Sequence, residues 1–229
     1  MQIVIRETFS RLHEQFRLND PKFTIYRGLT SNDHKLVPTL GRMALSNGST
    51  YDTVERRLIK DFKERSLPYL STTPSDDWEW LAVAQHHGLP TRLLDWTRNP
   101  LVAIYFAVRK ESDEDCVIYV LKREDQLLVD RSEWPSPFGV GGAPLRYVPS
   151  HVNPRIIAQD ALFTFHPGDV DSPYEDDSLE KIVIPKESRV RLKKELYHYG
   201  IHDASMFPGL DGIGSHLKWV HEFEQRRFW

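Results

Sequence analysis

Residues 101–108, LVAIYFAV, contain no charged side chain, and this run most limits what the chain can fold into. Asn99 and Pro100 precede it, and Pro is favoured at the first helical position because its missing N–H has no partner there. The sequence therefore predicts a helix that begins near Asn99. A helix that is apolar all round must be buried on every side. With 229 residues, 40% of them hydrophobic, the chain can build such a core as one large domain or two small ones.

Helical spacing of apolar residues recurs elsewhere in the chain. Ile5, Phe9, Leu12 and Phe16 predict an opening helix, and residues 53–67 predict a second one with a basic, solvated surround. Asp76 followed by Glu79 resembles a capping box, so we expect a helix there that Gly88 and Pro90 end. Two further helices are expected from Ser188 to Tyr199 and from about Leu210 onward.

Strands are predicted where β-branched and aromatic residues concentrate, at residues 23–28, 116–122, 156–165 and 181–185. Residues 132–154, rich in Pro and Gly, and the acidic residues 168–178 are expected to be loops. We therefore predict an α+β fold, a single domain with a helix-rich first half packed on a mixed or antiparallel sheet. Residues 1–19 are expected to form an N-terminal helix that precedes a domain spanning 20–229.

Composition excludes several classes of protein. The one cysteine, Cys116, cannot form an intramolecular disulfide and lies in an apolar run, which favours a buried thiol. No stretch approaches the ~20 apolar residues that span a bilayer, and no secretory leader is recognisable, so we expect a cytoplasmic protein without a membrane partner. The net charge of −3 argues against a wide surface that grips nucleic acid, although a local basic patch is allowed.

Residues 84–100, AQHHGLPTRLLDWTRNP, carry far more specific side chains than a connection between two helices needs. Several of these side chains have a structural interpretation. His86 and His87 can cap a helix C-terminus, Asp95 can support the next helix, and Arg92 can pair with Asp95. The concentration of hydrogen-bonding groups, including Gln85, is better explained by a site held on a rigid loop.

Two other stretches invite a functional interpretation. In TIYRG, Arg27 ends a strand beside Gly28 and can grip a phosphate or carboxylate, or form an ordinary ion pair. In YLSTTP, Ser71 and Thr72 can orient a ribose, although helix capping is the simpler interpretation. The ten histidines show no convincing metal-ligand spacing, so no metal site is expected.

The motifs IYRG, LVPTLGR, AQHHGLPTRLLDWTRNPLVAIYFAV, RIIAQDALFTFHP and MFPGLDGI together resemble the FRG domain family. The family is named for a Phe-Arg-Gly triplet, which stands here as Tyr26-Arg27-Gly28. The resemblance covers about residues 20–220. It implies a bacterial or phage setting with a toxin or anti-phage defence role, and a possible antitoxin as partner. It also implies that His86 is the functional member of the histidine pair.

The family has been proposed to be related to ADP-ribosyltransferases, which implies NAD as substrate and a nucleic acid or protein as acceptor. Arg27-Gly28 matches the Arg-Gly of such enzymes, and Ser71-Thr72-Thr73 is similar to their Ser-Thr-Ser on a later strand. Their acceptor-side Glu has no match, since residues 156–165 contain Gln159-Asp160 instead.

The resemblance also implies a role for each candidate residue. Catalytic roles fall to Arg27, His86, Asp95 and Asp160, with one of the two aspartates as the acid. NAD-binding roles fall to Tyr26, Arg27, Gly28, Ser71, Thr72, Gln85 and Arg92. Two alternatives stay open: a non-catalytic nucleotide or nucleic-acid binding module, and a nuclease-like hydrolase.

Overall fold

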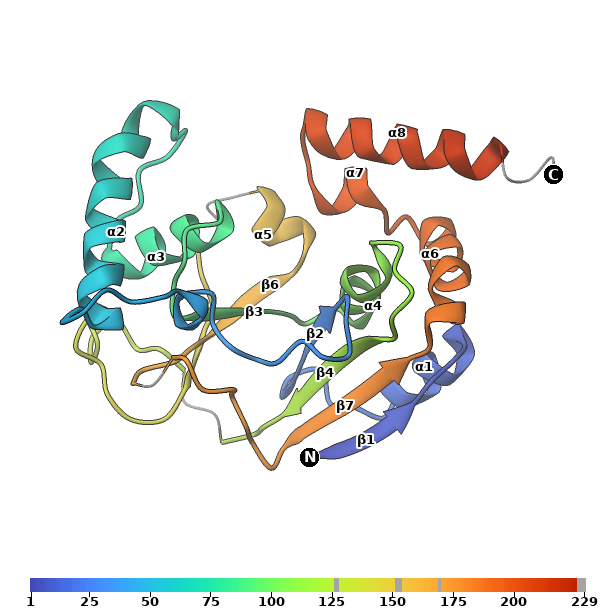
Figure 1. The fold of residues 1–229 in the computed structure, drawn as a ribbon, viewed down its shortest axis with the longest axis horizontal. Coiled ribbons are helices and arrows are strands. Elements are labelled where there is room, and N and C mark those ends of the chain that lie inside the picture. Colours follow the sequence, from blue (N-terminus) through green and yellow to red (C-terminus); the bar gives the residue numbers. More distant parts are fainter. Residues whose placement is uncertain (126–127, 151–153, 169, 226–229) are drawn as a thin grey trace.

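The computed structural model describes residues 1–125, 128–150, 154–168 and 170–225, and it has the expected α+β architecture (Figure 1). Within these residues a seven-stranded sheet runs in the order β1-β7-β4-β2-β3-β6-β5, and among its strand-to-strand pairs only that of β1 with β7 is parallel. The strands are β1 (Gln2–Ile5), β2 (Thr24–Leu29), β3 (Leu93–Thr97), β4 (Cys116–Lys122), β5 (Leu145–Tyr147), β6 (Ala161–Phe165) and β7 (Leu179–Ile184).

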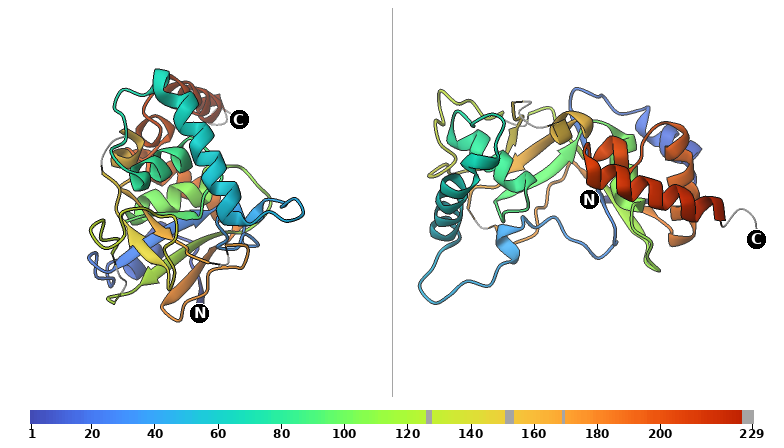
Figure 2. Two further views of the ribbon diagram at one scale, coloured as in Figure 1. Left: turned by 90° about the vertical axis from the view of Figure 1, so that its left-hand side faces the viewer. Right: turned by 90° about the horizontal axis from the view of Figure 1, so that it is seen from above.

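Helices lie at both ends of this sheet, with α2 and α3 at one end and α6 and α8 at the other (Figures 1 and 2). Within the described residues they are α1 (Phe9–Phe16), α2 (Tyr51–Ser66), α3 (Asp77–His86), α4 (Pro100–Val108), α5 (Pro154–Ala158), α6 (Arg189–His198), α7 (Asp203–Met206) and α8 (Leu210–Gln225), with 3-10 turns η1 (Leu40–Arg42), η2 (Leu67–Tyr69) and η3 (Lys186–Ser188). None of these helices is long and apolar enough to cross a bilayer.

The central helix is confirmed. Asn99 caps α4 by accepting from the Leu101 N–H, and Pro100 occupies its first turn. Six of its nine residues are buried, packed on strands β2, β4 and β7 and on α6. The thiol of Cys116 lies in this core, and burial raises its pKa to about 11. The cysteine is therefore structural.

Three sequence-based expectations were wrong. The chain opens with strand β1 and not with a helix through Ile5, because residues 2–5 pair with β7. Residues 93–97 are no loop but strand β3, which pairs with β6 along its whole length. The expected strand at 156–165 is divided, since residues 154–158 form α5 and only Ala161–Phe165 extend. The first two outcomes depend on pairing with residues distant in sequence, which local spacing does not report.

Other expectations are confirmed, including strands β2, β4 and β7 and helices α2, α3, α6 and α8. The expected loop at 132–154 contains the short strand β5, and its residues 151–153 lie outside the described residues, as does residue 169 of the acidic loop. Helices do not dominate the first half alone, because β1, β2 and β3 precede residue 98 and four helices follow residue 153.

Strands β2 and β3 are neighbours in the sheet but pair at one position, Tyr26 with Thr97. Beyond that pair the two strands separate, and each turns to its other partner, β4 or β6. The separation opens the middle of the sheet on the side where Arg27 and Asp95 lie.

Candidate functional site

A cleft of about 440 Å³ lies where β2 and β3 separate, which is within the size range of small-molecule sites. Its lining residues come from strands β2, β3 and β6, from η1 and α5, from the ends of α3 and α4, and from adjoining loops, including the residue after α7. The cleft brings together six of the residues singled out from the sequence: Tyr26, Arg27, Gly28, Gln85, His86 and Asp95.

Arg27 and Asp95 meet inside this cleft, although 68 positions separate them. One guanidinium nitrogen of Arg27 donates to the main-chain oxygen of Asp95 at 2.5 Å and to its Oδ2 at 3.2 Å. The Arg27 side chain is 15% exposed and that of Asp95 is 51% exposed. The pair therefore spans the opening between the strands, with the carboxylate accessible from solvent.

Gln85 at the end of α3 contacts the same carboxylate. Its Nε2 donates to Asp95 Oδ2 at 3.0 Å, and its Oε1 accepts from the buried Thr91 hydroxyl at 2.7 Å. Thr91 Oγ1 in turn accepts from the Leu93 N–H at the start of β3. This series of hydrogen bonds, from the Leu93 N–H through Thr91 and Gln85, holds the Asp95 carboxylate in one orientation.

His86 lines the cleft beside this pair, whereas His87 is exposed at the helix end. Burial, reinforced by the nearby positive charges, lowers the pKa of His86 to about 4. The ring is therefore neutral near pH 7. A neutral imidazole can donate or accept a hydrogen bond but is a weak base.

Positive charge dominates the cleft. Of its described lining residues, five are basic and one, Asp95, is a carboxylate; the basic ones are Arg27, Arg42, Arg109, Lys110 and Arg155. Burial, together with the charge of Arg27, lowers the pKa of the Arg42 guanidinium. Such a convergence favours a ligand with more than one negative charge.

An aromatic residue, Phe207, contacts two of these arginines. The guanidinium carbons of Arg109 and Arg155 lie 4.7 and 5.2 Å from its ring centroid. Phe106 meets the same ring edge-on at 6.1 Å. The cleft thus offers apolar ring surface beside its cations.

Gly28 also borders the cleft, and close packing explains why this position holds a glycine. A Cβ at this position would lie 1.9 Å from the Ala103 main-chain oxygen and 2.7 Å from the Ala107 nitrogen. Glycine is therefore required so that α4 can pack directly on β2, which also places Arg27 at the cleft.

The four remaining candidates are not among the described residues that line the cleft. Arg92 is buried in an ion pair with Glu55 and also donates to Asp52 at 3.0 Å. Ser71 and Thr72 lie in an exposed turn between η2 and α3, and not on a strand as the Ser-Thr-Ser of the similar enzymes does. Asp160 has φ of 43° and pairs with Arg98 at 3.2 Å.

Sequence reasoning missed Arg42, Arg109, Arg155 and Phe207. Arg42 lies in LVPTLGR and Arg155 lies in RIIAQDALFTFHP, two of the motifs that carry the family resemblance. Their place in these motifs could have identified both arginines as site residues. Among the described residues, no three or more His, Cys, Asp or Glu side chains are grouped so as to hold a metal ion.

Comparison with known families finds a similarity over part of the chain. The family model of the FRG domain matches residues 22–116. Residues 22–116 therefore carry the FRG domain. The FRG match runs from β2 to the start of β4 and includes Arg27, Arg42, Gln85, His86 and Asp95, but it is shorter than the span 20–220 that the motifs suggested. No curated protein and no solved structure matches the chain. The cleft therefore combines FRG residues with Arg155 and Phe207 from outside the match.

Proposed function

We propose that the cleft binds NAD and that the protein transfers its ADP-ribose to a macromolecule, either nucleic acid or protein. One observation carries the proposal: the Arg27–Asp95 pair lies in a cleft whose other charged lining residues, in the described part of the chain, are all cations. A diphosphate suits the cations, and one carboxylate suits a ribose that becomes cationic in the transition state.

The chemistry that this arrangement supports can be written bond by bond. The glycosidic carbon–nitrogen bond breaks and its electron pair leaves with nicotinamide, which becomes neutral. The acceptor donates an electron pair to the same ribose carbon and releases its proton to solvent. Asp95 supplies the negative charge that stabilises the developing cation, and the basic residues hold the diphosphate.

Gln85 and His86 have supporting roles in this proposal. Gln85 fixes the orientation of the Asp95 carboxylate through the hydrogen bond at 3.0 Å. Neutral His86 donates or accepts a hydrogen bond at a hydroxyl or amide of the substrate. Phe106 and Phe207 provide apolar surface for a flat ring.

Incubation with NAD labelled in its adenylate half, together with cell extract, tests the proposal. We expect release of nicotinamide and transfer of label to nucleic acid or protein, both lowered at least about 100-fold by Asp95→Asn. Asp160→Asn is the matched control, because its side chain is 45% exposed and pairs with Arg98 outside the cleft. Equal loss in both variants, or full activity in Asp95→Asn, would contradict the role given to Asp95.

A second candidate is nucleotide binding without bond cleavage. It is favoured by one observation, that Asp95 Oδ2 already accepts hydrogen bonds from both Arg27 and Gln85. Saturable NAD binding without nicotinamide release would support this candidate. Degradation of nucleic acid in the absence of NAD would instead support the hydrolase alternative.

The biological setting that the FRG resemblance implies is a toxin or anti-phage role. If the transferase acts on an essential macromolecule, induced expression in bacteria should arrest growth, and Asp95→Asn should relieve the arrest. Equal growth with both forms would argue against a toxin.

A further inference from the structure

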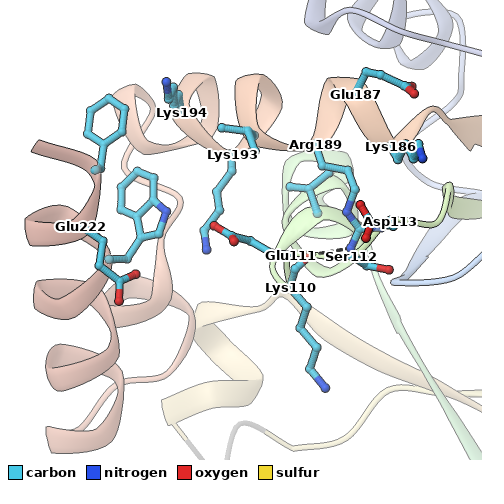
Figure 3. A pocket seen from close by; sticks show the side chains of 14 residues that line it. Lys110, Glu111, Ser112, Asp113, Lys186, Glu187, Arg189, Lys193, Lys194 and Glu222 are labelled. Carbon is cyan, nitrogen blue, oxygen red and sulfur yellow. Dashed lines mark hydrogen bonds between the residues drawn. The ribbon is translucent and has the colours of Figure 1, made fainter. Parts of the chain in front are cut away.

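A second cavity, of about 570 Å³, lies between α6, α8 and residues 110–113 that follow α4 (Figure 3). Lys110 lines both this cavity and the cleft, so the two adjoin. The second cavity takes no part in the chemistry proposed above. Most of its lining also lies outside residues 22–116.

One wall of the second cavity is aromatic. Trp219 and Phe223, one turn apart on α8, stack with ring centroids 5.4 Å apart and an interplanar angle of 5°. Lys193 Nζ lies 5.3 Å from the Trp219 ring and Lys194 Nζ lies 4.6 Å from the Phe223 ring. Flat rings beside cations are how proteins hold single-stranded nucleic acid, with bases stacked and phosphates paired.

Basic and acidic side chains complete the lining. Arg189 is committed to the fold, since it donates to the carbonyls of Thr30, Lys110 and Glu114 and so ties the residues after α4 to α6. Lys186 is exposed at the rim and Lys194 stands beside the aromatic wall, both available to a phosphate (Figure 3).

Four carboxylates also line the cavity: Glu111, Asp113, Glu187 and Glu222. Carboxylates accept hydrogen bonds from ribose hydroxyls and from the amino groups of bases. The lining thus offers a partner for each part of a nucleotide: cations for phosphate, carboxylates for the sugar and base N–H groups, and rings for the base. A protein partner fits less well, because the core of a protein interface is depleted in Lys, Glu and Asp.

We infer that the second cavity binds a nucleotide unit of single-stranded nucleic acid. This strand is the acceptor of the proposed reaction, and it reaches the cleft by passing Lys110. The acceptor role rests on the proposed function, whereas the binding does not. A free nucleotide has the same chemistry, so the experiment includes one.

Fluorescence anisotropy with labelled single-stranded DNA and RNA oligonucleotides of mixed sequence tests the inference, with AMP and polyglutamate as competitors. We expect strand binding that weakens with salt and falls about tenfold or more in Trp219→Ala, with Trp219→Phe restoring most of it. Because Trp219→Ala can disturb α8, Lys186→Glu provides a second variant that leaves the aromatic wall intact. Lys60→Glu is its control, since Lys60 is 76% exposed on α2, away from the cavity.

The outcomes separate the possibilities. No strand binding, or equal binding by Trp219→Ala, Lys186→Glu and Lys60→Glu, overturns the inference. If AMP binds as tightly as the strand, the ligand of the cavity is a free nucleotide. If polyglutamate binds in place of the strand and this binding depends on Trp219, the ligand is a protein. NAD is titrated in the same samples. If the protein binds the strand but does not bind NAD, the proposed function is contradicted and the inference about the second cavity is not.

Discussion

Gln85 Nε2 donates a hydrogen bond of 3.0 Å to Asp95 Oδ2, which joins the last turn of α3 to the third residue of β3. The Thr91 hydroxyl holds the other end of the Gln85 amide. An α3 side chain therefore orients the carboxylate that the proposed reaction uses, and the sequence separation between the two residues is only ten.

We predict that Gln85→Ala lowers turnover of NAD roughly ten- to 100-fold while KM changes little, because a misoriented carboxylate affects the transition state more than binding. Thr91→Val, which removes only the hydroxyl that holds Gln85, should cause a smaller loss of the same kind. Steady-state kinetics checks both. A rise in KM with unchanged kcat would show that Gln85 binds substrate instead of positioning Asp95.

Gly28→Ala should destabilise the protein by several kcal/mol, since the added Cβ would meet backbone atoms of α4 at 1.9 Å and 2.7 Å. Gly214→Ala in the exposed part of α8, where a Cβ meets nothing within 4 Å, should instead stabilise by about 1 kcal/mol. Denaturant unfolding measures both. Near-equal effects of the two substitutions would show that close packing is not what Gly28 provides.

Arg92→Ala should cost about 3–5 kcal/mol of folding free energy, because it leaves the fully buried Glu55 carboxylate without its partner. Arg56→Ala, which removes a half-exposed partner of Asp52, should cost at most about 1 kcal/mol. Chemical denaturation gives both values. If Arg92→Ala abolished NAD binding at full stability, Arg92 would belong to the site, as the family resemblance implied.

Folding stability should fall as the pH drops below about 6.5. Burial lowers the pKa of His86 to about 4 and that of His166 to about 3, so both stay neutral in the folded protein while the unfolded chain gains protons. The unfolded state binds more protons in this window, and each histidine should cost up to about 2 kcal/mol at pH 5.

Unfolding of His86→Asn at pH 7 and pH 5 checks this dependence. The loss on acidification should be smaller than in the wild type, whereas substitution of the exposed His221 should leave it unchanged. Identical losses in all three proteins would show that His86 is protonated in the folded state.

Much of the fold could be predicted from local patterns. The cap at Asn99 and the apolar run behind it predict α4, and β-branched runs predict β2, β4 and β7, because caps and side-chain periodicity depend on neighbours in the chain. Strand β3 was missed for the opposite reason. Its residues, with Asp95 among them, become a strand only by pairing with β6, more than 60 positions away.

The sequence by itself determined which residue types the site can use, since Arg27, Gln85, His86 and Asp95 all stand out within their motifs. Only the tertiary structure decided which of them act together. It placed these four in one cleft, directed Arg92 to Glu55, and added Arg109, Arg155 and Phe207 from distant segments. The physical reason is that spacing along a chain reports contacts within a helix or strand, whereas a cleft forms where two strands, here β2 and β3, separate.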